Sequence, residues 1–264
     1  METKDNQNLQ HNQQTSDISL LDIITGIFIS PKQTFDSLKN IGKKHLWVVP
    51  FIIIIILGIL TTFLFNNDNE LTSESKTLQK EYLQKMIDNI EKKEKSNEIP
   101  SEQAAKIKED LQKNIDNATG ETGYIGIHIG NIIYILFLSL VILISTKILK
   151  GQITYLNIIN IIVLSMLILC VGDLINIIAS ILLGYNTNIG LNIFLKPPIV
   201  PFYATVFFGA IDLFDVWFLV VLSIGISKIA NLKFTTLFVI LIVVRVIIAL
   251  ALSFTTLLPD IIFG

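Results

Sequence analysis

Five long apolar stretches decide what this chain can fold into. They lie at residues 46–65, 124–149, 157–183, 203–226 and 234–257, and each contains at least 20 residues. A bilayer core of about 30 Å needs about 20 residues of α-helix to cross it. Helices satisfy their own backbone groups in hydrocarbon, and the stretches lack the alternation of barrel strands. The sequence therefore predicts an all-α, polytopic membrane helical bundle with five transmembrane helices in a domain at 46–257.

The N-terminal part of the chain precedes the first of these stretches. Residues 1–16 are charged, rich in Asn and Gln and without periodicity, so we expect a disordered tail. Residues 17–45 begin with an apolar part that is too short to span a bilayer, which predicts a cytoplasmic or interfacial helical segment. Ser30, Pro31 and Gln33 indicate the start of a second helix in this segment, with a capping box.

A polar insert at 66–123 separates the first and second stretches. It holds 9 Lys and 13 Asp or Glu residues, although only 16% of the whole chain is charged. Apolar residues recur at helical spacing in its two halves. The first stripe is Leu78, Tyr82, Met86 and Ile90, and the second is Ala104, Ile107, Leu111, Ile115 and Ala118. We expect an acidic, extramembrane helical hairpin in which the two stripes face each other; a loose acidic loop is the alternative.

Four charged residues lie inside the apolar stretches, away from their ends: Asp173, Asp212, Asp215 and Arg245. Charges at this depth are expensive and are either functional or paired. Asp215 and Arg245 are equally distant from the polar turn at 227–233, so antiparallel neighbouring helices would bring them to the same depth. We therefore predict an intramembrane ion pair between them. Asp212 is expected nearby, about 4.5 Å further along the same face of the helix.

The sequence argues against several classes of chemistry. It has no HExxH, GxSxG or GxxxxGK[ST] motif, and its three histidines (His11, His45 and His128) are scattered. Asp173 and Asp212 are a weak basis for an intramembrane aspartyl protease, because their flanking residues match no such family. A net charge of −2 offers no surface for nucleic acid, and the single cysteine, Cys170, has no disulfide partner in the chain. We expect no enzyme, no cofactor and no metal site.

The placement of Lys residues predicts the orientation in the membrane. One side of the five stretches has Lys32, Lys39, Lys43, Lys44, Lys147, Lys150, Lys228 and Lys233 close to them, whereas the short loop on the other side has Lys196. The lysines of the insert are more distant and weigh less. We therefore expect a cytoplasmic N-terminus, with the C-terminus and residues 66–123 extracytoplasmic. Nineteen of the 20 basic residues are Lys, a bias toward A/T-rich codons that indicates a bacterial cytoplasmic membrane.

Three segments resemble a known family of membrane proteins. They are ISPKQTFDSLK, KGQITYLNIINIIVLSMLILCVGDLI and, most strongly, IDLFDVWFLVVLSIGISKIANLKFTTLFVILIVV at 211–244, which includes Asp212, Leu213, Phe214, Trp217 and Gly225. The chain resembles the Yip family of Ypt/Rab-interacting proteins, of the bacterial type, loosely over residues 20–255. The resemblance implies five spans and a cytoplasmic N-terminus. Eukaryotic members act in vesicle trafficking with Rab GTPases and partner membrane proteins, a role that we do not carry over, because fold does not fix function.

Two classes of function fit these features. The first is a non-catalytic membrane organiser or adaptor, embedded in the lipid bilayer, that binds other membrane proteins or a second copy of itself. It would use its N-terminal segment, its bundle or the acidic hairpin. The alternative is a small ion or metabolite transporter or channel, in which Asp173, Asp212 and Asp215 line a polar path. Transporters usually contain inverted repeats, and the sequence shows no internal repeat.

Overall fold

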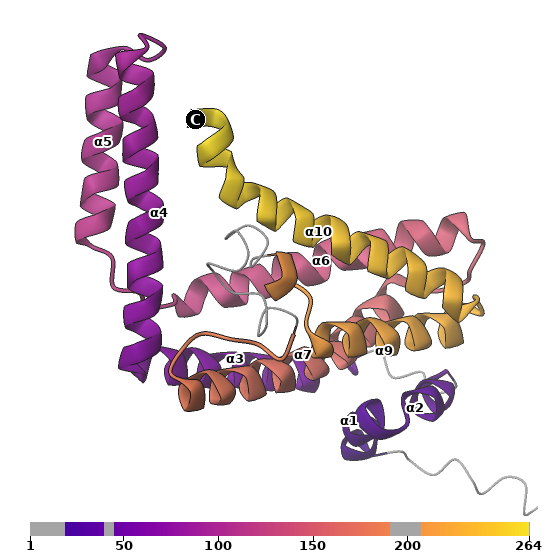
Figure 1. The fold of residues 1–264 in the computed structure, drawn as a ribbon. Coiled ribbons are helices and arrows are strands. Elements are labelled where there is room, and N and C mark those ends of the chain that lie inside the picture. Colours follow the sequence, from indigo (N-terminus) through magenta and orange to yellow (C-terminus); the bar gives the residue numbers. More distant parts are fainter. Residues whose placement is uncertain (1–18, 40–44, 191–206, 264) are drawn as a thin grey trace, which may run out of the picture.

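The computed structural model describes residues 19–39, 45–190 and 207–263, and the regular elements within these ranges are helices (Figure 1). Five of them are long and apolar enough to cross a membrane, which confirms the predicted fold class. These are α3 (Val48–Asn67), α6 (Tyr124–Ile148), α7 (Tyr155–Leu183), α9 (Leu213–Ala230) and α10 (Phe234–Phe263). The expected disordered tail at 1–16 lies outside the described residues.

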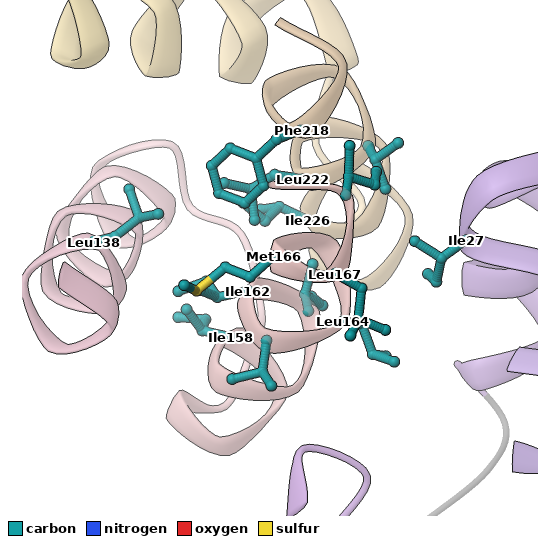
Figure 2. Packing of buried hydrophobic residues seen from close by; sticks show 14 of the residues in the cluster. Ile27, Leu138, Ile158, Ile162, Leu164, Met166, Leu167, Phe218, Leu222 and Ile226 are labelled. Atoms are coloured by element: carbon teal, nitrogen blue, oxygen red, sulfur yellow. The ribbon is translucent and has the colours of Figure 1, made fainter. Parts of the chain in front are cut away.

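Helix α7 lies at the centre of the bundle. In its apolar part 67% of the residues are buried, against 17% for α3 and 22% for α10. Figure 2 shows Ile162 and Met166 of α7 between Leu138 of α6 and Phe218 of α9. The outer helices α3, α6 and α10 present large apolar side chains on their free faces, as helices do that contact lipid. The third apolar stretch of the sequence is therefore the scaffold on which the others pack.

The fourth span begins later than the sequence suggested. We expected it at 203–226; residues 203–206 lie outside the described residues, and α9 begins at Leu213. Asp212 has an extended backbone and is the N-cap of α9, so its expected place one turn further along a continuous helix is wrong. Its carboxylate accepts the backbone N–H of Asp215 at 2.8 Å, which satisfies a donor that every helix start leaves free.

Two short helices precede the first span and pack on α7 and α9: α1 (Leu20–Ile29) and α2 (Pro31–Leu38). A capping box between Ser19 and Asp22 starts α1. The capping box that we expected at Ser30 and Gln33 does not form. Pro31 does take the first position of α2, but the Ser30 side chain makes no cap hydrogen bond. Ser30 is also the C-cap of α1. Its backbone N–H donates to the Gly26 carbonyl there, and its backbone conformation is that of the end of α1.

The docking of α2 on α9 depends on a glycine. Phe35 is fully buried, and a Cβ atom added at Gly225 would lie 2.8 Å from its Cζ and 2.5 Å from Cγ2 of Ile161. Two polar contacts accompany this packing. Lys228 Nζ lies 2.7 Å from Asp36 Oδ2, and Lys39 Nζ donates to Asn231 Oδ1 at 2.7 Å. The N-terminal helices are therefore fixed to the end of the bundle that carries the α9–α10 turn (Figure 1).

The insert forms the helical hairpin that the sequence predicted, from α4 (Asn69–Lys95) and α5 (Ser101–Asp116). Figure 1 shows the two helices antiparallel and projecting from the bundle at a steep angle. The Asn66 side chain holds the base of the hairpin by two hydrogen bonds with Thr122, at 2.9 and 3.1 Å. Near the tip, Lys108 Nζ lies 2.7 Å from Glu94, and this hydrogen bond lowers the pKa of the Glu94 carboxyl below its ordinary value. The contribution of the pair is therefore present at neutral pH and is lost as the pH falls through that lowered pKa.

The second expected apolar stripe faces α4 as predicted, and the first stripe faces α5 only in part. Ala104, Leu111 and Ala118 of the second stripe are buried. In α4 the buried residues opposite are Ile87 and Ile90, whereas Leu78 is 42% exposed and Tyr82 is 37% exposed. Ile90 is therefore buried as predicted, whereas the assignment of Leu78 and Tyr82 to the interface was wrong, because both side chains are exposed.

The arrangement allows a direct test of the proposed orientation. The hairpin lies at one end of the bundle and the α9–α10 turn at the other (Figure 1). We expect a cysteine at Lys92 to react with an impermeant maleimide in intact cells, and a cysteine at Lys233 to react only after permeabilisation. Both positions are exposed, and Cys170, the single native cysteine, is replaced by alanine in both variants. Equal labelling of the two positions in intact cells would rule out the orientation.

Candidate functional site: a polar cavity inside the bundle

A cavity of about 390 Å³ lies among α7, α9, α10 and the connection that precedes α9. Its walls are unusually polar for the interior of a membrane bundle. Polar side chains lining it are Asp173, Asn176 and Ser180 from α7, Asn186, Thr187 and Asn188 from the connection, Asp212 and Asp215 from the start of α9, and Arg245 from α10. The cavity thus collects all four charged residues that the sequence analysis singled out.

The start of α9 positions two of the carboxylates. Asp212 and Asp215 form a reciprocal capping box, in which Asp212 N–H donates to Asp215 Oδ2 at 3.3 Å. The second oxygen of Asp212 accepts a hydrogen bond from Asn176 Nδ2 at 2.8 Å, which connects α9 to α7. Both aspartates are buried. Their carboxylates are therefore held rigidly by backbone and amide donors.

Arg245 joins α10 to this cluster. Its Nη2 lies 2.6 Å from Asp215 Oδ1 and also donates to the Ala210 carbonyl at 2.6 Å. The side chains are 19% and 12% exposed, respectively, so the ion pair is largely shielded from solvent. Asp215 lies 15 residues before Ala230, or about 22 Å along the helix, so the pair lies near the end of α9 that is opposite the α9–α10 turn. The structure thus brings together Asp215 and Arg245, which the sequence analysis predicted to pair because they are equally distant from the α9–α10 turn.

Asp173 differs from the other three charged residues. It lines the same cavity, but its residue is exposed, and within the described part of the chain no hydrogen bond or ion pair is formed by its carboxylate. It lies one helical turn before Asn176, so both side chains share one face of α7. The cavity is therefore open beside a carboxylate without a partner.

The sequence analysis missed the residues that close the cavity from the side of the connection. Asn176 Oδ1 accepts the Ile189 N–H at 2.9 Å, and Ser180 Oγ bonds to the backbone N–H and carbonyl of Thr187 at 3.0 and 2.9 Å. Glu74 of the hairpin accepts the Asn186 N–H at 2.6 Å. The signal for Asn176 and Ser180 was present, since they follow Asp173 at helical spacing. The connection has no periodicity that could have indicated its place.

The charged side chains that line the cavity do not balance one another. Three carboxylates face a single guanidinium, so the charged side chains leave an excess of two negative charges. Among the described residues, no group of three His, Cys, Asp or Glu side chains is placed to hold a metal ion. Cys170 is a free, buried thiol. His128 of α6 packs against Gly58 of α3, and His11 lies outside the described residues.

These features define the chain as a multi-pass helical membrane protein with a polar cavity inside the bundle and a helical hairpin projecting from it. Comparison with family models places it further: the Yip1 domain matches residues 25–255. The chain belongs to the Yip1 domain family, which is not known as a family of enzymes. Comparison with curated proteins and with solved structures gives no match.

Proposed function

We propose that this Yip1 domain protein is a non-catalytic membrane organiser, which binds a partner protein through the extramembrane hairpin. The observation that carries the proposal is the exposed apolar stripe on α4, formed by Leu78 and Tyr82. Exposed large apolar side chains are ordinary when they are scattered, but these two occupy successive turns of one helix face. In our proposed orientation, this face lies outside a bacterial cytoplasmic membrane.

The hairpin is suited to transmit an interaction to the bundle. Its base is held by the Asn66–Thr122 hydrogen bonds, and Glu74 reaches the connection beside the polar cavity. Helix α10 also contacts α4 (Figure 1). A partner on α4 would thus sit on an element that is attached to the membrane domain at several points. We favour this function over a small transporter or channel, because the sequence contains no internal repeat.

A photo-crosslinking pair tests the proposal. We expect benzoylphenylalanine at Tyr82 to give one discrete crosslinked protein in native membranes, identified by mass spectrometry. The same group at Gln84 is the matched control, because Gln84 is exposed on the same helix but points away from the stripe. Leu78→Asp is expected to remove the Tyr82 adduct without lowering the abundance of the protein. Equal crosslinking from both positions, or an adduct that survives Leu78→Asp, would contradict the proposal.

A further inference from the structure

The cavity contains buried oxygen atoms that form no hydrogen bond within the described chain. Thr187 is only 6% exposed, lines the cavity, and has an Oγ1 atom with no hydrogen-bond partner. Asn188 Oδ1 is buried in the same wall and also has no partner. The Asp173 carboxylate opens onto the same space. Buried polar atoms are nearly always hydrogen-bonded, so an unsatisfied set of this kind points to a ligand.

The orientations of these acceptors are fixed by the fold. Asn188 Nδ2 donates to the Gly209 carbonyl at 2.6 Å, and this bond leaves Oδ1 as its free atom. The backbone of Thr187 is held on both sides by Ser180 Oγ. The connection cannot turn these groups away without losing these bonds. These hydrogen bonds therefore hold the acceptors in place in the wall of the cavity.

The carboxylates of Asp212 and Asp215 are already engaged. Both oxygens of Asp212 and of Asp215 accept hydrogen bonds or pair with Arg245. Arg245 offsets one of the three carboxylates, and its Nε remains a donor without a partner. What the cavity lacks is positive charge together with several donors. Water would satisfy the hydroxyl and the amide, but it would not offset the carboxylates.

We propose that this cavity binds a primary ammonium group, with Asp173, Thr187 and Asn188 as its acceptors. An ammonium carries one positive charge and three N–H donors, which matches one free carboxylate and two neutral acceptors. The volume of about 390 Å³ falls in the range of small-molecule sites and far exceeds a bare ion. The Arg245 Nε–H is available to a neutral oxygen of the same ligand.

The ammonium has two possible sources. The first is the headgroup of a lipid such as phosphatidylethanolamine, because the chain is a membrane protein and α7 has exposed apolar residues close to Asp173 in the sequence, including Ile175 and Ile178. The second is a small soluble amine. The lipid headgroup and the soluble amine present the same ammonium group to the same acceptors. Changing the lipid composition of the membrane distinguishes the two sources.

The test measures the thermal unfolding of the full chain in nanodiscs. In phosphatidylcholine nanodiscs, ethanolamine is expected to raise the unfolding temperature in a saturable way, and choline, which has no N–H donor, is expected not to. If the lipid is the source, phosphatidylethanolamine nanodiscs raise the unfolding temperature by themselves and abolish the response to ethanolamine. If the response to ethanolamine persists there, the source is a soluble amine.

Variants connect the response to the site. Asp173→Asn is expected to weaken ethanolamine binding at least tenfold without lowering the unfolding temperature in its absence, because Asp173 has no partner in the described part of the chain. Glu81→Gln on the exposed face of the hairpin removes the same charge elsewhere and is expected to behave as the unmodified protein. An equal response to choline, an unchanged response in Asp173→Asn, or no response to either amine or lipid would overturn the proposal. None of these outcomes bears on the crosslinking of Tyr82.

Discussion

Replacing Arg245 by leucine is expected to lower the amount of folded protein in membranes several-fold. The substitution leaves the Asp215 carboxylate buried without its ion-pair partner and removes the donor to the Ala210 carbonyl. Breaking a buried pair from one side costs about 3–5 kcal/mol, because the remaining charge is uncompensated. This loss is comparable with the whole stability of many proteins. The measurement is membrane abundance by immunoblotting, together with the unfolding temperature of purified protein.

A second substitution tests whether Arg245 and Asp215 act as a pair or independently of each other. Adding Asp215→Asn removes the stranded charge and keeps an oxygen that can accept the Asp212 N–H. We therefore expect the double variant to recover part of the lost abundance. If the double variant is no better than Arg245→Leu alone, the pairing does not account for the effect.

A second ion pair of similar length serves as the control for burial. Lys228 Nζ lies 2.7 Å from Asp36, but the two side chains are 29% and 49% exposed. Exposed ion pairs contribute at most about 1 kcal/mol. Lys228→Leu is therefore expected to change abundance little. A loss as large as that of Arg245→Leu would mean that burial does not determine the effect.

Leu111→Asp is expected to unfold the hairpin. Leu111 is buried between α5 and α4, and the substitution both removes its apolar contacts and places a carboxylate in the interface. The expected cost is about 3–5 kcal/mol, more than two isolated helices of this length can absorb. Amide hydrogen exchange of residues 69–116 in the full protein is expected to become fast. The transmembrane helices, which make their own packing contacts, are expected to remain protected.

The same chemical change at Leu78 is the matched control. Leu78 is 42% exposed on the face of α4 that α5 does not cover. Leu78→Asp is therefore expected to leave the exchange of the hairpin unchanged, although it removes the proposed partner contact. Fast exchange in both variants would mean that the original prediction of the α4 interface was correct and the packing described above is wrong.

The five spans and the hairpin could be predicted from the sequence because each depends on a local pattern. A helix that crosses a bilayer needs a long apolar stretch, and the second stripe of the insert has a single apolar face. The Asp215–Arg245 pair followed from the same kind of reasoning, because a short turn sets the relative depth of two neighbouring helices. In each case the residues that decide the structure are close together along the chain or related by one turn.

The remaining features depend on contacts that no local pattern reports. Asp212 stood in an apolar stretch and was placed inside a helix, although the Asp212–Asp215 spacing also fits a helix start. Which apolar residues of α4 are buried depends on how α5 approaches. The cavity depends on Thr187 and Asn188, which lie in an irregular connection with no periodicity. Tertiary packing decides all three.

The docking of α2 has a consequence for biosynthesis. Phe35 leaves the ribosome before Gly225, against which it packs, and α9 begins 175 residues after the end of α2. At about 5–20 residues per second, α2 waits roughly 9–35 s for its site to exist. During that interval its apolar face is available to chaperones and proteases. The burial of Phe35 thus requires that α9 has been made, and a product truncated before α9 leaves this face uncovered.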